Sequence, residues 1–180
     1  PDPQGLQSWV THLIDSARLG SGPKQSGRVN MSVALLNSPE FQDGGYFVIR
    51  LYLAMLGRPP LREEFIRDYD AIFSASTPEF ESKKNALVAE FVQRPEFKSK
   101  HDGLRDAQEV RAVVDQPQTI SAFRNHAFVL MQFFAHLARD PKPSEYEERL
   151  KMLNATGNYH QLVFDFIYSV EYRKRFSYVN

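Results

Sequence analysis

The sequence predicts an all-α protein, a helical repeat bundle of about eight to ten helices in three related units, the first of them incomplete. Apolar residues recur at three- and four-residue spacing, and no stretch shows the alternation typical of a strand. In addition, residues 46–60 recur as residues 127–141, with six of fifteen positions identical at a constant offset. A chain of 180 residues with this pattern is expected to form a single helical domain.

The first predicted helix runs from Pro3 to Leu19, because its apolar residues follow the spacing of one helix face. Residues 20–23, Gly-Ser-Gly-Pro, end it, and a second apolar stripe covers residues 29–37. Residues 38–41, Ser-Pro-Glu-Phe, then supply a capping hydroxyl, a proline for the first helical position and a first-turn carboxylate. A short helix is expected there.

The next predicted helix, residues 46–56, is apolar around most of its circumference, which is typical of a helix in the protein interior. Gly57 ends it, and Pro59 and Pro60 begin an amphipathic partner whose apolar positions lie between residues 65 and 73. These two helices are expected to form a hairpin.

A third helix follows the N-cap pattern of residues 76–80 and ends at residues 94–97, Arg-Pro-Glu-Phe. The polar stretch 102–121 is interpreted as a connector with one helix near residues 104–114. Residues 123–139 then repeat the buried helix and residues 144–153 repeat its partner. The expected units are therefore 1–42, 43–101 and 122–180.

Each unit closes on a similar segment, because residues 31–41, 87–97 and 162–172 align without gaps. The first unit lacks the buried helix that opens the other two. We expect that helix to precede Pro1 in a longer parent chain, whose other domains would be partners of this one.

Two short motifs carry a resemblance to a known family. Residues 56–60 read Leu-Gly-Arg-x-Pro, and residues 1–9 read Pro-Asp-x-x-Gly-Leu-x-x-Trp. Together they resemble the signature of the bacterial family called domain of unknown function 4214, in particular an acidobacterial-type subgroup. The resemblance implies an extracellular or cell-surface helical module without assigned catalysis.

The chain departs from that signature at two positions in its later units. Where the family has glycine and tryptophan, the second unit has Glu64 and Asp68, and the third has Glu145 and Arg149. The binding behaviour of these units is therefore expected to differ from that of the first. Glu145 also lies beside Arg149 and Lys151, which is typical of a solvated helix face.

The composition argues against several classes of partner. The 22 basic and 22 acidic residues cancel, so no long-range field favours nucleic acid. The apolar windows 46–56 and 127–137 fall short of the roughly 20 residues that span a bilayer, so no membrane insertion is expected. There is no cysteine, and the five histidines lack metal-ligand spacing. We therefore expect no catalytic residue, no metal site and no cofactor.

Four residues are candidates for ligand binding. Arg58 and Arg139 recur at the helix hairpins, where a guanidinium could fork onto a carboxylate, phosphate or sugar, or could satisfy the carbonyls at a helix C-terminus. Trp9 and Tyr46 could stack on a sugar ring or pack in the core. The structural role is the stronger expectation for all four.

The leading hypothesis is a non-catalytic interaction module of an exported bacterial protein, which binds envelope glycan or a partner subunit. The alternative is a purely structural spacer between other domains. A hydrolytic enzyme is the third class, and it would require a pocket with convergent polar groups that the sequence does not display.

Overall fold

The computed structural model describes residues 24–73, 77–102 and 105–176. Within these ranges it contains α-helices, one π-helical segment and no strand, which confirms the all-α prediction. The predicted helix over residues 3–19 lies outside the described residues.

The helices have the following bounds. In chain order they are α2 (Lys24–Leu36), α3 (Pro39–Asp43), α4 (Gly45–Leu56), α5 (Arg62–Ile72), α6 (Thr77–Phe91), α7 (Pro95–His101), α8 (Ala107–Val114), α9 (Pro117–Gln132), the π-helical segment η1 (Phe133–Leu137), α10 (Pro143–Thr156), α11 (Tyr159–Ile167) and α12 (Val170–Arg175).

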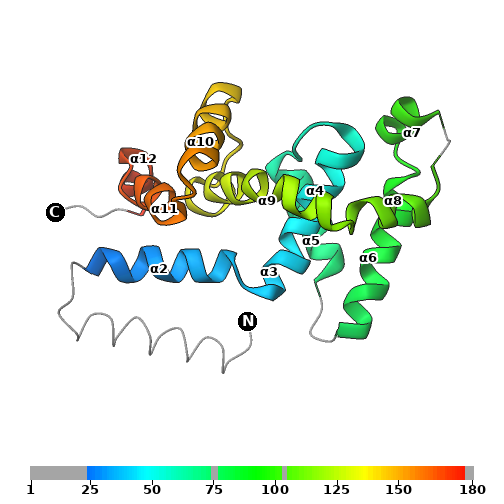
Figure 1. The fold of residues 1–180 in the computed structure, drawn as a ribbon, viewed down its shortest axis with the longest axis horizontal. Helices are drawn as coiled ribbons and strands as arrows, with labels where there is room; N and C mark the ends of the chain where they lie inside the picture. Colours follow the sequence, from blue (N-terminus) through cyan, green and yellow to red (C-terminus); the bar gives the residue numbers. More distant parts are fainter. Residues whose placement is uncertain (1–23, 74–76, 103–104, 177–180) are drawn as a thin grey trace.

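Helices α4 and α9 pack against each other at the centre of the molecule (Figure 1). They correspond to the two copies of the repeated apolar stretch. Almost every residue of α4 is buried, and so is every residue of α9 from Ala127 to Gln132. A helix that is apolar around its circumference must be enclosed on all sides, so the other helices lie around this pair.

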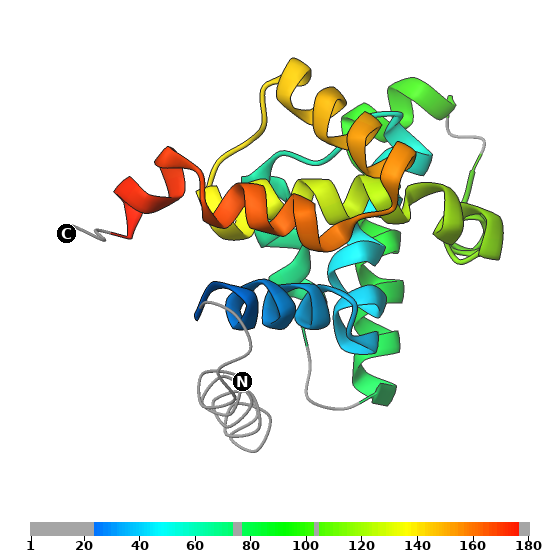
Figure 2. The ribbon, with the colours of Figure 1, turned by 60° about the vertical axis from the view of Figure 1, so that its left-hand side comes forward.

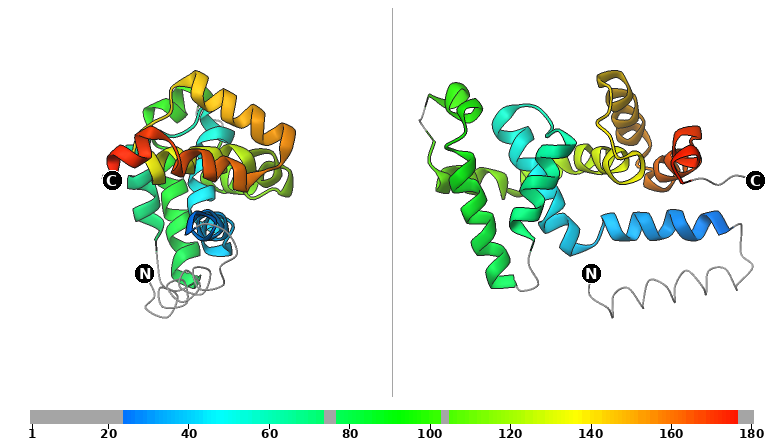
Figure 3. Two further views of the ribbon diagram at one scale, coloured as in Figure 1. Left: turned by 90° about the vertical axis from the view of Figure 1, so that its left-hand side faces the viewer. Right: turned by 180° about the vertical axis from the view of Figure 1, so that it is seen from behind.

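The helix that precedes each central helix packs against a helix from the other half of the chain. Helix α2, which precedes α4, packs on α11, while α8, which precedes α9, packs on α6 (Figure 2). The view from behind places α6 and α8 at one end of the molecule and α10 to α12 at the other (Figure 3). This arrangement ties residues 24–101 to residues 105–176 through contacts that are distant in sequence.

The start of α9 differs from the prediction. The sequence predicted a helix from Phe123, but the structure begins it at Pro117, inside the expected connector 102–121. Gln116 has extended backbone and Pro117 occupies the first helical turn, where its missing N–H is not needed. The first turn of α9 therefore lies beside α4 rather than in a polar loop.

The ends of the two central helices are alike in conformation and different in sequence. Gly57 ends α4 with φ 64°, and Ala138 ends η1 with φ 53°. The left-handed conformation costs an alanine about 1 kcal/mol because its Cβ approaches the backbone, whereas glycine adopts it freely. Ala138 therefore occupies a position that favours glycine.

His136 of η1 is a half-buried histidine. Its Nε2 has no hydrogen-bond partner among the described residues, and its ring meets the Tyr172 ring edge-on at 5.6 Å between centroids. Burial lowers the pKa of His136 to about 4. The matching position of α4 holds Met55, which is buried.

None of the helices in the described ranges is long and apolar enough to cross a membrane.

Exchanging the two capping residues tests the conformational argument. We predict that Ala138→Gly raises the free energy of unfolding by about 0.5–1 kcal/mol, and that Gly57→Ala lowers it by about 1 kcal/mol. A Cβ on Gly57 would have its nearest neighbour at 3.8 Å, so the cost there is conformational and not steric. Urea denaturation measures both variants, and a loss of stability in Ala138→Gly would contradict the argument.

Stability is predicted to fall as His136 takes up a proton. An unfolded histidine has a pKa near 6.5 and the folded one about 4, so the unfolded state binds the proton more tightly between these values. This histidine alone should lower the free energy of unfolding by about 2 kcal/mol between pH 7.5 and pH 5. His136→Met, which copies the matching residue of α4, should remove that part of the pH dependence in urea denaturation. Identical pH profiles for the two proteins would refute the assignment.

Candidate functional site

Arg58 lies in the turn between α4 and α5 and is held by two carboxylates. Its Nε and Nη2 donate to the two oxygens of Glu96 at 2.8 and 2.6 Å, and its Nη1 and Nη2 donate to the two oxygens of Glu64 at 2.8 Å. Nη1 also donates to the Pro59 carbonyl at 3.1 Å. These bonds use all the N–H groups of the guanidinium.

Arg139 repeats this arrangement between η1 and α10. Its Nε and Nη2 donate to Glu171 at 2.6 and 3.0 Å, and its Nη1 and Nη2 donate to Glu145 at 2.9 and 3.0 Å. Nη1 donates to the Asp140 carbonyl at 3.0 Å. We call the two sets, Arg58 with Glu64 and Glu96 and Arg139 with Glu145 and Glu171, the arginine clamps. Each donor has its counterpart in the other clamp, although the three-unit repeat itself stays a prediction.

The clamps hold the hairpins together electrostatically. The Arg58 guanidinium holds the pKa of Glu96 below its usual range, and Arg139 does the same for Glu145 and Glu171. Glu145 was predicted to lie on a solvated face, but it turns back to Arg139. The structure therefore corrects the role of this residue.

The main-chain carbonyls at the C-terminal end of α4 contact side chains other than Arg58, the arginine that the sequence predicted for this role. Lys100 Nζ donates to the Leu56 carbonyl, and His101 Nε2 lies 2.7 Å from the Met55 carbonyl. Both side chains come from the end of α7. Arg58 is thereby left to its carboxylates, and a ligand could reach its N–H groups only by displacing one of them.

The position of Asp68 is central to a second ion-pair network. Asp68 is 1% exposed and accepts hydrogen bonds from Tyr52 Oη, from Arg67 Nε and from both terminal nitrogens of Arg94, each at 2.8 Å. A shallow hollow of about 350 Å³ lies over this network between α5 and α6. Four of its charged groups pair with one another and Lys83 pairs with Glu79, so each of them already has a partner of opposite charge.

The third section of the chain has an ion pair between Arg149 and Asp165 in place of this network. Arg149 stands where the second section has Asp68, and it donates to Asp165 at 2.9 Å. Its guanidinium lies 5.7 Å from the centroid of the Phe166 ring, as that of Arg94 lies 4.8 Å from the Phe91 ring. The departures from the family signature are therefore parts of intramolecular ion pairs.

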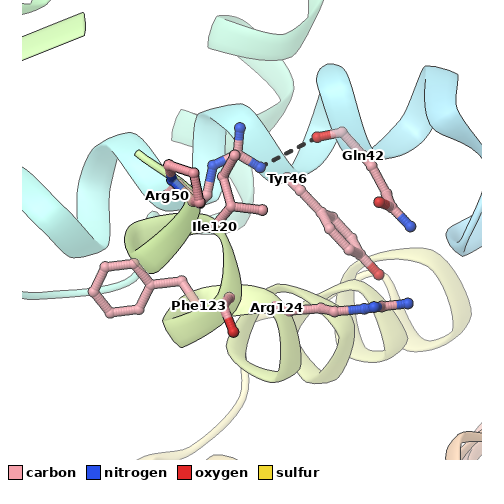
Figure 4. Close-up of a pocket in the computed structure, with 8 residues that line it drawn as sticks. Gln42, Tyr46, Arg50, Ile120, Phe123 and Arg124 are labelled. Carbon is pink, nitrogen blue, oxygen red and sulfur yellow. Dashed lines mark hydrogen bonds between the residues drawn. The ribbon is translucent and has the colours of Figure 1, made fainter. Parts of the chain in front are cut away.

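A partly enclosed pocket of about 320 Å³ lies between α4 and α9 (Figure 4). Its polar lining comes from both helices and from α3, and its apolar lining comes mainly from the first turns of α9. The lining residues are Gln42, Tyr46, Arg50, Ile120, Phe123 and Arg124, together with Pro117 and Ser121. We call this the α4–α9 pocket.

Tyr46 is one of the four predicted candidates, and it lines this pocket while it packs in the core. The residue is 3% exposed, and its ring meets Phe41 edge-on at 5.5 Å between centroids. Its hydroxyl has no hydrogen-bond partner among the described residues. Burial raises the pKa of this hydroxyl, and the nearby positive charge of Arg124 opposes the shift. The hydroxyl is thus a buried donor without an acceptor.

Arg50 is the second buried polar residue of the pocket. It is 5% exposed, and its Nε has no hydrogen-bond partner among the described residues. One terminal nitrogen donates to the Gln42 carbonyl at 3.3 Å, and the other lies 3.9 Å from Asp115. Burial lowers the pKa of Arg50, because the charged form is poorly solvated there.

Arg124 places a second guanidinium at the pocket from the opposite helix. Its side chain is exposed, donates to Asn37 at 3.2 Å and lies 5.9 Å from the centroid of the Tyr159 ring. Asn37 follows α2, just as Asp115, the partner of Arg50, follows α8. Each central helix therefore sends an arginine to the segment that leads into the other.

Comparisons with protein-family models, with curated proteins and with solved structures find no match to this chain. The resemblance to the domain of unknown function 4214 family stays a prediction. The functional argument therefore rests on the geometry of the chain itself.

The histidines of the described ranges offer no arrangement typical of acid–base catalysis. His101 contacts a backbone carbonyl, His126 Nδ1 lies 2.6 Å from the Tyr146 hydroxyl, His136 contacts the Tyr172 ring, and His160 is exposed on α11. The described residues also contain no group of three His, Asp or Glu side chains placed to hold a metal ion. The absence of catalysis remains a prediction.

The structure does not bring the four predicted binding residues together. Arg58 and Arg139 lie in separate clamps, Tyr46 lines the α4–α9 pocket, and Trp9 lies outside the described residues. Sequence reasoning missed Arg50 and Arg124 as site residues. The signal for Arg50 was its place as the one charged residue of an otherwise apolar helix.

Replacing the clamp arginines tests their structural role. We predict that Arg58→Gln and Arg139→Gln each lower the free energy of unfolding by about 1–2 kcal/mol, because two carboxylates lose a forked partner that is partly shielded from solvent. Arg58→Lys should recover little, since an ammonium cannot bridge both carboxylates.

Urea denaturation measures these variants, with Arg173→Gln on the exposed side of α12 as the control that should change stability by less than about 0.5 kcal/mol. Unchanged stability in both clamp variants would show that the clamps do not hold the hairpins.

Proposed function

We propose that this chain is a non-catalytic binding module that holds an anionic group of its ligand in the α4–α9 pocket. The observation that carries the proposal is a pocket lined by two guanidinium groups and by two buried donors, Tyr46 Oη and Arg50 Nε, that lack acceptors among the described residues. A buried donor without an acceptor costs about 1–3 kcal/mol. An anion would supply the acceptor and recover part of that cost.

The wall of the pocket that Arg124 forms can move. Arg124 is exposed and lies near the Tyr46 hydroxyl, so its side chain can move to admit a ligand. Tyr46 and Arg50 are fixed by the packing of α4. A rigid donor set with one movable cation is suited to binding an anion with a modest change of shape.

The resemblance to an exported bacterial family supports an extracellular or cell-surface setting. In that setting the anionic group would belong to an envelope glycan or to a partner subunit. These ligands are proposals that rest on the resemblance, whereas the anionic character rests on the charges at the pocket.

The second candidate function is a structural spacer, and the arginine clamps favour it. Both clamps fix helix hairpins with fully used guanidinium groups, as a rigid connecting module requires. A spacer, however, gives no account of the buried unpartnered donors at the α4–α9 pocket.

Titration with simple anions distinguishes these functions. We expect isothermal titration to detect binding of at least one of acetate, glucuronate, phosphate and phenylacetate, with affinity reduced about tenfold or more in Arg124→Gln because a charge-assisted hydrogen bond is lost. Arg173→Gln is the matched control and should bind as the unmodified chain does. Absence of binding by every anion, or equal binding by Arg124→Gln, would refute the proposal.

Tyr46→Phe separates the binding role of the hydroxyl from its role in folding. We expect the free variant to be as stable as the unmodified chain or more stable by about 1 kcal/mol, because no hydrogen bond is lost and a buried polar group is removed. Its affinity for the bound anion should nevertheless fall. A loss of stability above about 1 kcal/mol in urea denaturation would show that the hydroxyl already has a partner.

A further inference from the structure

We infer that the ligand of the α4–α9 pocket is an organic monoanion with a compact apolar body, such as an aryl-substituted carboxylate. This inference rests on the proposed function and adds the chemical class of the ligand. Four features of the pocket support it: its volume, its charge, the nature of its walls and the arrangement of its polar groups.

The volume limits the size of the ligand. The pocket holds about 320 Å³, which is at the lower end of the range of about 300–1,000 Å³ that small-molecule sites occupy. A ligand of about ten non-hydrogen atoms fits such a space. A long glycan chain could place only one terminal residue there.

The charge favours a single negative group. Arg50 already has Asp115 at 3.9 Å, and Asp43 also stabilises its charged form. Arg124, in contrast, is bonded to the neutral amide of Asn37 and lies over the neutral ring of Tyr159. The pocket therefore has about one uncompensated positive charge, which one carboxylate would neutralise.

The walls favour an apolar body. Ile120 is 40% exposed in the first turn of α9, and it lines the pocket together with Pro117 and Phe123. The Ser121 hydroxyl is the small polar group among these α9 residues. A sugar ring would bring several hydroxyl groups against this wall without partners, and each such group would weaken binding.

The two ends of the pocket differ in polarity. Figure 4 shows the Tyr46 hydroxyl beside the Arg124 side chain and the Phe123 ring toward the opposite end, with Ile120 and the Arg50 guanidinium near each other between them. A carboxylate at Tyr46 and Arg124 would direct its attached body over Ile120. The ligand is thereby oriented as well as neutralised.

The experiment compares four probes by isothermal titration with the unmodified chain. Phenylacetate has the carboxylate and an apolar ring, glucuronate has the carboxylate and a hydroxylated ring, phosphate has charge without a body, and phenylacetamide has the ring without charge. We expect phenylacetate to bind at least about tenfold more tightly than each of the other three, since burial of the ring adds to the ion pair.

Two matched variants locate the apolar contact. Ile120→Ser should weaken phenylacetate binding about fivefold and leave glucuronate binding unchanged. Ile66→Ser is the control, because Ile66 is 37% exposed on α5 and does not line the pocket. Far-ultraviolet circular dichroism establishes that both variants fold.

The outcomes separate this inference from the proposed function. Binding of glucuronate or phosphate as tight as that of phenylacetate, with loss of affinity in Arg124→Gln, would overturn the ligand class and keep the anion site. Equal binding by Ile120→Ser and the unmodified chain would also overturn the ligand class. Failure of all charged probes would refute both.

Discussion

The contact between α4 and α9 is the constraint on which the arrangement of the other helices depends. Both helices are apolar around most of their circumference, so neither can face solvent along its length. They bury one side against each other, and the remaining sides require cover from further helices. Because α2 packs on the second half of the chain and α8 packs on the first, these contacts tie the two halves together.

Polar side chains buried within this apolar centre favour a functional role for their site. Arg50 and Tyr46 could each have been replaced by an apolar residue, as Met131 and Ala127 occupy the matching positions of α9. Keeping a buried guanidinium and a buried hydroxyl without a full set of partners costs stability. Such a cost at a pocket favours a binding role, in contrast with the clamps, where every guanidinium N–H has an acceptor.

The two arginine clamps are the same structural device in two places with different surroundings. The arginine, the glutamate six residues later and the glutamate of the closing segment have the same contacts in both places. A further ion pair lies near each clamp, Asp68 with Arg94 near the first and Arg149 with Asp165 near the second. Asp68 is almost fully buried and accepts four hydrogen bonds, whereas Arg149 donates one to Asp165, so the surroundings of the two clamps differ.

The sequence by itself determined the helical class, the buried character of most of residues 46–56 and 127–137, and the capping of the short helices, because these follow from local spacing and backbone preference. Local rules could not find Glu96 and Asp115 as partners of arginines, since those contacts join positions distant in the chain. The pocket beside α9 was likewise decided by packing. Tyr46 and Arg50 are one helical turn apart on α4, but only the tertiary structure brings Arg124 of α9 to them, because two helices must pack together before their side chains can share a pocket.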